Sequence, residues 1–192
     1  PTSIARLEAI PNYYLLYYYE TQAWLRYQAG HPTRASEVMA IEEELLVKYR
    51  DPNLCEKPPE LMKRGGAYYS DSAAELMADI SSDAGTIHVV NTRSGGAVPG
   101  MPADVVMELP CRITKNGAEP LATKAMRPDM DGLVRTVKDF ELLTIRAAVE
   151  VDEDAAIRAL LINPLGPDLS TAEQVWRRLK EVHKGWLGEL DD

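Results

Sequence analysis

Residues 104–123 read DVVMELPCRITKNGAEPLAT, and their turn, Lys115-Asn116-Gly117, lies between two segments of strand-like composition. An Asn-Gly pair in such a place is a strong signal for a tight β-hairpin. Just upstream, residues 86–93 (TIHVVNTR) are rich in β-branched side chains and run into the glycine-bearing loop SGGAVPGMP. These patterns predict a small, mostly antiparallel sheet in the middle of the chain.

Helical patterns precede this predicted sheet. Residues 13–28 are apolar or aromatic in nearly every direction, which predicts a mostly buried helix. A second helix is predicted over 36–49, with a solvated glutamate run at 42–44. A third is predicted over 70–80, with Leu76, Met77 and Ile80 facing inward. Ser72 and Glu75 could form its capping box, or Ser70 or Asp71 could cap it.

Helical patterns also follow the sheet. A long helix is expected after Pro128, and shorter ones over 152–162 and 171–186, the last capped by Asp168 or Ser170. The predicted fold class is therefore α+β, with long helices packed on a small sheet.

Composition limits the class of protein. The chain has 192 residues, 45% of them hydrophobic and 27% charged, as expected of one soluble globular domain over 1–192. Its net charge of -9 argues against nucleic acid or an anionic membrane as a partner. No apolar run approaches the roughly 20 residues of a membrane span, and no leader pattern opens the chain. Pro1 in place of methionine suggests an excised segment or a processed terminus.

Metal and cofactor motifs are missing from the sequence. It contains no GxGxxG, Walker, GxSxG or HExxH pattern, and its three histidines (His31, His88 and His183) fall in different predicted elements. His31 and His88 are expected to be structural and His183 solvated. Cys55 and Cys111 stand far apart without a CxxC pattern, which indicates free thiols in a reducing cytoplasm.

Five stretches, taken in order, carry a family resemblance that covers nearly the whole chain. They are AIPNYYLLYYY (9–19), TRASEVMAIEEEL (33–45), DPNLCEKPPELMKRGGAYYSDSAAELM (51–77), IHVVNTRSGGAVPGMPADVVMELPC (87–111) and ALLINPLGPD (159–168). Together they resemble the C-terminal half of the family 4 glycoside hydrolases, especially the 6-phospho-β-glucosidases. The resemblance implies a fold similar to the C-terminal domain of lactate and malate dehydrogenases.

The resemblance also implies an unusual chemistry, an exception to two-carboxylate glycoside hydrolysis. In this family NAD oxidises the sugar at C3, a base removes the acidified C2 proton, and the aglycone leaves by elimination. Water then adds to the unsaturated intermediate, and the hydride returns from the cofactor. A divalent metal, usually manganese, polarises the C2 and C3 oxygens and stabilises the enediolate. The implied substrates are phosphorylated disaccharides or aryl glucosides.

The resemblance names one catalytic residue. The family's base on the β-glycoside branch is a tyrosine in a stretch that matches RGGAYYSD, and the matching position is Tyr69. The positive end of a helix and a nearby metal ion would favour its phenolate form. Tyr68 is expected to pack. Without the resemblance, both rings would be interpreted as covering the edge of a core.

Two further residues are candidates for substrate binding. Asn91 and Arg93 stand where the first strand enters a glycine-bearing loop, and a guanidinium fork suits the 6-phosphate. A surface salt bridge is the alternative for Arg93. Many relatives have Asn in place of Ser94, so contacts around this loop remain open. Arg34 could bind phosphate or a partner subunit, or it could be an ordinary surface residue of its helix.

The glycine-rich NAD loop and the metal-binding Cys and His of the family come from its N-terminal half. No cofactor-binding or metal residue is therefore assigned in this chain, and NAD and a metal, expected to be Mn, belong to the complete enzyme. The chain is expected to be the substrate-side domain, inactive alone, of a homo-oligomer (dimer or tetramer). The alternatives are another specificity (α-glucoside, α-galactoside or galacturonide) and a non-catalytic oligomerisation module.

Overall fold

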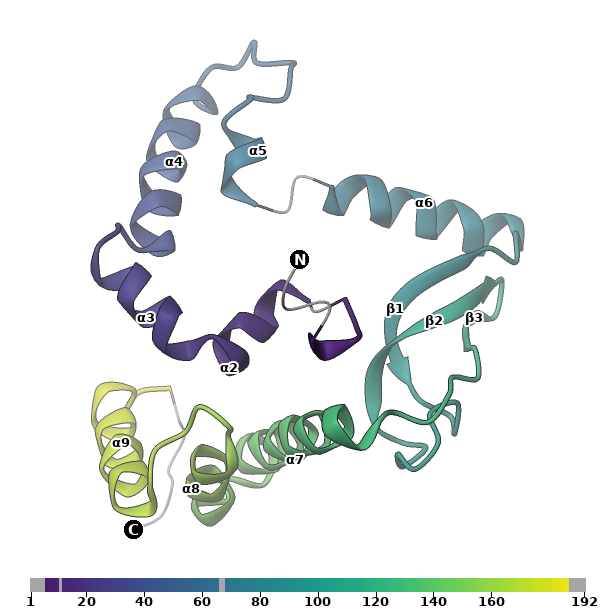
Figure 1. The fold of residues 1–192 in the computed structure, drawn as a ribbon. Helices are drawn as coiled ribbons and strands as arrows, with labels where there is room; N and C mark the ends of the chain where they lie inside the picture. The colour runs from purple at the N-terminus through teal and green to yellow at the C-terminus, as the bar shows by residue number, and fades with distance from the viewer. Residues whose placement is uncertain (1–5, 11, 66–67, 187–192) are drawn as a thin grey trace. The chain divides into compact units, whose positions relative to one another are not determined.

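A computed structural model describes residues 6–10, 12–65 and 68–186 (Figure 1). The chain divides into two compact units, one made of the described parts of Pro1–Arg26 and Met126–Asp192, the other of Tyr27–Ala125. Helices combine with a small antiparallel sheet, so the predicted α+β class is confirmed.

The sheet of the second unit has three antiparallel strands in the order β1-β2-β3. They are β1 (Ile87–Arg93), β2 (Val106–Thr114) and β3 (Gly117–Pro120). The predicted hairpin joins β2 to β3, and its Gly117 has a φ of 108°, which favours glycine. In the register of the first pair, Asn91 lies opposite Glu108 and Arg93 opposite Val106.

One face of this sheet is covered and the other is open. The covered face carries Leu109, Cys111 and Ile113, all nearly fully buried, and helix α6 (Tyr69–Ser82) packs against β2 there. Because side chains alternate along a strand, the open face carries Ile87, Val89, Asn91 and Arg93. The candidate residues of β1 therefore face away from α6.

Two more helices of this unit pack together. They are α4 (Arg34–Lys48) and α5 (Leu61–Arg64). The side chain of Thr33 caps α4 by accepting a hydrogen bond from the amide of Ser36. Leu45 is buried at 2% exposure.

The first unit contains the C-terminal helices. They are α7 (Pro128–Glu150), α8 (Glu153–Ile162) and α9 (Leu169–Val182). Helix α8 packs against both α7 and α9, and small side chains (Ala155, Ala156, Ala159 and Ala172) are buried there. The side chain of Asp168 caps α9, as predicted, and α9 ends four residues before the predicted end at Trp186.

The N-terminal aromatic segment differs from its prediction. Residues 13–28 form η1 (Tyr13–Leu15), α2 (Leu16–Tyr19) and the start of α3 (Thr21–Ala29) instead of one helix. The chain breaks at Glu20, whose backbone leaves the helical region (φ -129°, ψ 28°). The predicted burial is wrong, because no residue of these three helices is buried. The rings instead pack against one another, edge-on for Tyr13 and Trp24 and stacked for Tyr14 and Tyr17.

Helix α6 also departs from its prediction. It begins at Tyr69, so Ser70, Asp71 and Ser72 lie inside the first turn and none of them is the cap. Met77 is 65% exposed, which contradicts its predicted inward position, and Leu76 is half-buried. None of the described helices is long and apolar enough to cross a membrane.

Candidate functional site

Tyr69 is the first residue of α6, and its side chain is 80% exposed. Tyr68 is the N-cap residue, but no side chain caps the helix there. Amides of the first turn are therefore without a capping side chain, and they create a positive potential near the phenol of Tyr69. Asp71, in the same turn, reduces this potential. The prediction that Tyr68 packs is wrong, because its side chain is 69% exposed.

Asn91 and Arg93 lie two residues apart on the open face of β1. Within the described part of the chain, Arg93 forms no hydrogen bond or ion pair, so the salt-bridge interpretation has no support there. A guanidinium with unused donors can bind a phosphate through two parallel hydrogen bonds. Glu108, opposite Asn91, brings a carboxylate to the same face.

The loop after Arg93 is anchored by Ser94, which is fully buried. Its hydroxyl donates a hydrogen bond to the carbonyl of Pro102 (2.7 Å), and its amide donates to the carbonyl of Val105 (2.8 Å). Gly95 and Gly96 follow with φ values of 56° and 85°. Ser94 thus fixes the point at which β1 ends. This structural role of Ser94 was not predicted from the sequence, where the position stands out only as a departure from relatives.

The structure brings Asn91 and Arg93 together but does not join Tyr69 to them. Asp79, which contacts β1, lies ten residues after Tyr69, about 15 Å along a helix. No hydrogen bond or ring contact between described residues links Tyr69 with either β1 residue. Because α6 covers the opposite face of the sheet, the two parts are separate candidates.

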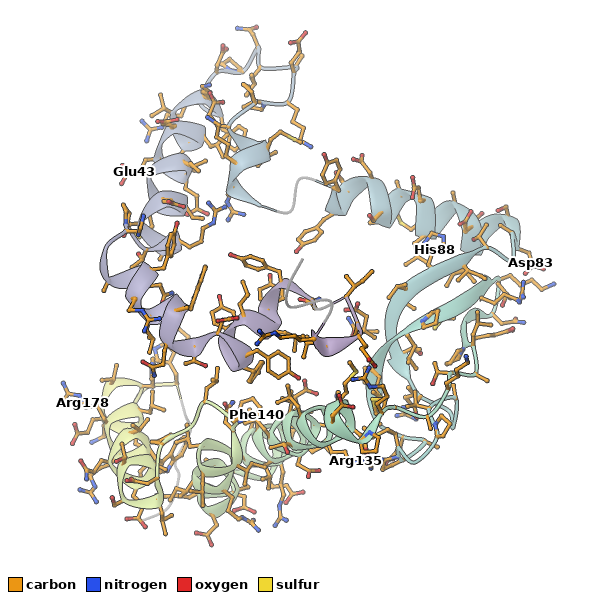
Figure 2. The ribbon with its side chains drawn as sticks, viewed as in Figure 1. Glu43, Asp83, His88, Arg135, Phe140 and Arg178 are labelled. Carbon is orange, nitrogen blue, oxygen red and sulfur yellow. The ribbon has the colours of Figure 1, made fainter. Side chains whose placement is uncertain are left out.

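His88 has a structural role. Its Nε2 atom lies 2.6 Å from Oδ2 of Asp79, where α6 meets β1 (Figure 2). Thr86 donates a hydrogen bond to the same oxygen (2.5 Å), and these two bonds hold the pKa of Asp79 below its ordinary value. His31 stacks on Tyr27 and hydrogen-bonds its carbonyl (2.7 Å).

Neither the described histidines nor the cysteines gather into a metal site. No group of three or more His, Cys, Asp or Glu side chains among the described residues could hold an ion. His183 is exposed at the end of α9, as expected. Burial raises the pKa of the Cys111 thiol, which opposes the thiolate form that binds metals. Cys55 is exposed, and both thiols are free.

Comparison with known proteins identifies the domain type. Residues 2–166 match the family 4 glycosyl hydrolase C-terminal domain. The chain is 40% identical to a probable 6-phospho-beta-glucosidase of Bacillus subtilis, covering 99% of this chain and 44% of that protein. It is 38% identical to the 6-phospho-beta-glucosidase BglT of Thermotoga maritima, covering 93% of this chain and 42% of that protein. The chain thus spans less than half the length of these relatives.

Solved structures agree with this assignment. The 6-phospho-beta glucosidase of Thermotoga maritima, solved with manganese, NAD+ and glucose-6-phosphate, superimposes with a TM-score of 0.88 at 36% identity. The match covers 97% of this chain and 45% of that one. A 6-phospho-alpha-glucosidase from gut microorganisms shares the fold at 22% identity, with a TM-score of 0.80.

Proposed function

The chain belongs to the family 4 glycosyl hydrolases, and from this premise we propose that it is the C-terminal, substrate-side domain of a 6-phospho-β-glucosidase. The observation that carries the proposal is the difference in identity between the branches of the family. Relatives named 6-phospho-beta-glucosidases are 34–40% identical to the chain. Those named for α-glucosides or maltose phosphate are 24–27% identical, which favours the β-glucoside specificity.

In this proposal Tyr69 is the base that removes the proton from C2 of the sugar. A base must reach the proton it abstracts, and the exposed phenol at the start of α6 is open to a ligand. Tyr68 is similarly exposed but is assigned no chemical role.

The complete enzyme would use NAD to accept a hydride from C3 and a divalent metal, Mn, to polarise the C2 and C3 oxygens. The described residues of this chain do not supply a set of ligands for such an ion. The proposed contribution of this chain is therefore limited to the base and to contacts with the substrate.

Arg93 and Asn91 are proposed to bind the substrate, with Arg93 directed to the 6-phosphate. Its unpaired guanidinium and the amide of Asn91 share one face of β1 and offer several donors to an anion. Because this face lies away from α6, Arg93 and Tyr69 do not line one site among the described residues, so the two assignments are alternatives that are tested separately.

Two coarser features of the complete enzyme belong to the same proposal. We expect a cytoplasmic protein, since Cys55 and Cys111 are both free thiols. We also expect a homo-oligomer, since exposed rings such as Tyr13 and Tyr14 (63% and 67%) offer apolar area to another copy.

The full-length enzyme with Tyr69→Phe tests the assignment of the base. With NAD, Mn²⁺ and a 6-phosphoglucoside in D₂O, this variant should lose exchange of the C2 proton while NAD still binds. Tyr68→Phe is the matched control, because it removes the same hydroxyl from the adjacent exposed ring, and it should keep exchange. Exchange at the normal rate in Tyr69→Phe would overturn the proposal.

A further inference from the structure

The loop between β1 and β2, residues 94–105, is held in place by contacts within its own unit. Three of its side chains are no more than 8% exposed, namely Val98, Met101 and Val105. The amide of Thr123, which follows β3, donates to the carbonyl of Ala97 (2.8 Å) and ties the loop to the rest of the unit. A loop with buried side chains and a fixed backbone suits a binding site that is formed before its ligand arrives.

Ser94 is the first residue of this loop, and its hydroxyl, amide and carbonyl are all engaged. The hydroxyl donates to the carbonyl of Pro102 (2.7 Å), and the amide donates to the carbonyl of Val105 (2.8 Å). The carbonyl of Ser94 accepts a hydrogen bond from the amide of Ala97 (2.8 Å). Because Ser94 is fully buried, water does not reach it to compete for these three bonds.

Arg93 precedes Ser94 and is held less directly. The amide of Ser94 bonds to the segment leading into β2, and hydrogen-bonded pairs alternate along an antiparallel ladder, so Arg93 and Val106 form a non-hydrogen-bonded pair. The amide and carbonyl of Arg93 therefore point away from β2, because β1 is an outer strand of the sheet. The backbone position of Arg93 thus depends on the bonds of its neighbours, and on the loop side that neighbour is Ser94.

We infer that Ser94 is a positioning residue for Arg93 and thereby raises the affinity for the 6-phosphate of the substrate, an inference that rests on the proposed function. Ser94 is fully buried, so it does not touch the phosphate itself. It fixes the point at which β1 ends, and the exposed guanidinium of Arg93 extends from that fixed backbone. A guanidinium fork with a preset position loses less freedom when it binds a phosphate.

Ser94→Ala in the full-length enzyme is the direct test. It removes the hydroxyl but keeps the amide and carbonyl bonds of residue 94, so the fold should persist. KM for 4-nitrophenyl β-glucoside 6-phosphate should rise roughly 3- to 10-fold, the value of one neutral hydrogen bond, with little change in kcat. KM for the unphosphorylated glucoside should not change. Hydrogen exchange of the Ala97 amide should become faster.

A double-mutant cycle shows whether Ser94 acts through Arg93. Once Arg93 has been replaced by Ala, Ser94→Ala should add nothing further to KM for the phosphorylated substrate, because no guanidinium is left to misplace. Independent effects of the two substitutions would instead multiply. A multiplied rise in KM in the double variant would therefore overturn the inference.

Two further variants separate this role from a general loosening of the loop. Ser94→Cys keeps a weaker donor in nearly the same volume, so it should raise KM less than Ser94→Ala. Thr123→Val is the matched control, because it removes a hydroxyl that donates to the carbonyl of Ala97 (3.2 Å) but keeps the amide bond to that carbonyl. Thr123→Val should leave KM for both substrates unchanged. An equal rise in KM in Thr123→Val would contradict a specific role of Ser94.

Failure of this inference can be told apart from failure of the proposed function. If Arg93→Ala raises KM for the phosphorylated substrate and Ser94→Ala does not, only the positioning role is wrong. If Ser94→Ala raises KM equally for the phosphorylated and the unphosphorylated glucoside, the positioning role is also wrong, because the effect does not depend on the phosphate. If Arg93→Ala itself leaves both KM values unchanged, the phosphate binds elsewhere, and the proposed role of Arg93 fails together with that of Ser94.

Discussion

The Nε2 atom of His88 lies 2.6 Å from Oδ2 of Asp79, and this contact ties β1 to α6. The same carboxylate oxygen accepts a hydrogen bond from the hydroxyl of Thr86 (2.5 Å). The side chains of His88 and Asp79 are 22% and 24% exposed, so the contact is partly shielded from water. It connects the helix that begins with Tyr69 to the strand that carries Asn91 and Arg93.

The first prediction concerns the pH dependence of this contact. Hydrogen bonds from Thr86 first, and then from His88, hold the pKa of Asp79 below its ordinary value of 3.8 in the folded protein. A lowered pKa means that the carboxylate stabilises the fold above pH 3.8 and that this contribution is lost as the pH falls through the folded pKa. Asp79→Asn should therefore be less stable than wild type at pH 6, and the difference should shrink towards pH 3.

Hydrogen exchange of the β1 and α6 amides between about pH 3 and 7, corrected for intrinsic rates, measures this difference. Asp104→Asn is the control, because Asp104 is exposed in the same unit and makes no ion pair with a described residue. A gap between wild type and Asp79→Asn that widens as the pH falls would contradict the prediction.

The elements best predicted from sequence are those specified by local residues. The Asn-Gly turn, Pro128 at the start of α7 and Asp168 at the start of α9 all act within a few residues. The start of α6 was predicted within one residue, but its cap was not, because several residues there (Ser70, Asp71 and Ser72) favour capping and only the structure shows that none of them caps.

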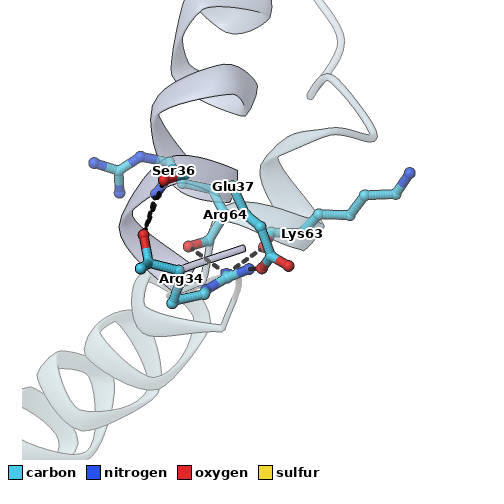
Figure 3. A network of polar contacts seen from close by, with 6 residues as sticks. Arg34, Ser36, Glu37, Lys63 and Arg64 are labelled. Atoms are coloured by element: carbon cyan, nitrogen blue, oxygen red, sulfur yellow. Dashed lines mark hydrogen bonds and ion pairs between the residues drawn. The ribbon is translucent and has the colours of Figure 1, made fainter. Parts of the chain in front are cut away.

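Predicting the buried residues and the candidate site required knowledge of contacts between residues that are distant in the sequence. Apolar spacing shows which side chains could be buried but not which element covers them, so the exposure of Tyr13 and Tyr14 was not foreseen. Tyr69 was identified through family resemblance alone. The hydrogen bond from the Arg34 guanidinium to the carbonyl of Lys63 (Figure 3) joins residues 29 apart, and no local pattern marks such a contact.

The second prediction concerns the two faces of the sheet. Ile113 is 1% exposed on the covered face, and Ile87 is 59% exposed on the open face. Ile113→Ala should cost about 3 kcal/mol, because it removes buried methyl groups and leaves a cavity. Ile87→Ala makes the same chemical change and should alter stability by no more than about 0.5 kcal/mol. The free energy of opening, from hydrogen exchange of the β2 amides, measures both.

Equal losses in the two variants would contradict the assignment of the faces. The comparison is internally matched, because the residue type, the substitution and the sheet are the same, and only burial differs. A large cost for Ile87→Ala would mean that another element covers the open face in solution. That face would then be closed to a substrate, and Arg93 could not bind one there.

The third prediction tests Arg93 directly. In the full-length enzyme, Arg93→Ala should lower kcat/KM for 4-nitrophenyl β-glucoside 6-phosphate by about 10- to 100-fold, the usual value of hydrogen bonds to a charged group. The loss should appear mainly in KM, because a phosphate distant from the reacting carbons is bound equally in ground and transition states. The unphosphorylated glucoside should show little change.

Arg112→Ala is the matched control for this test. Arg112 lies on β2 opposite Ile87, so it belongs to the same open face, but its Nη1 atom already donates to the carbonyl of Gly85 (3.0 Å). Removing it subtracts the same charge from the same face without removing a free fork. Because Arg112 pairs with the other end of β1, about 20 Å along the strand from Arg93, it controls for the loss of net charge and not for the local field at Arg93. If both variants lower kcat/KM for the phosphorylated substrate equally, the cause is the lost charge and not a direct contact. If Arg93→Ala lowers kcat/KM equally for the phosphorylated and the unphosphorylated glucoside, the role of Arg93 is structural and the phosphate must bind elsewhere.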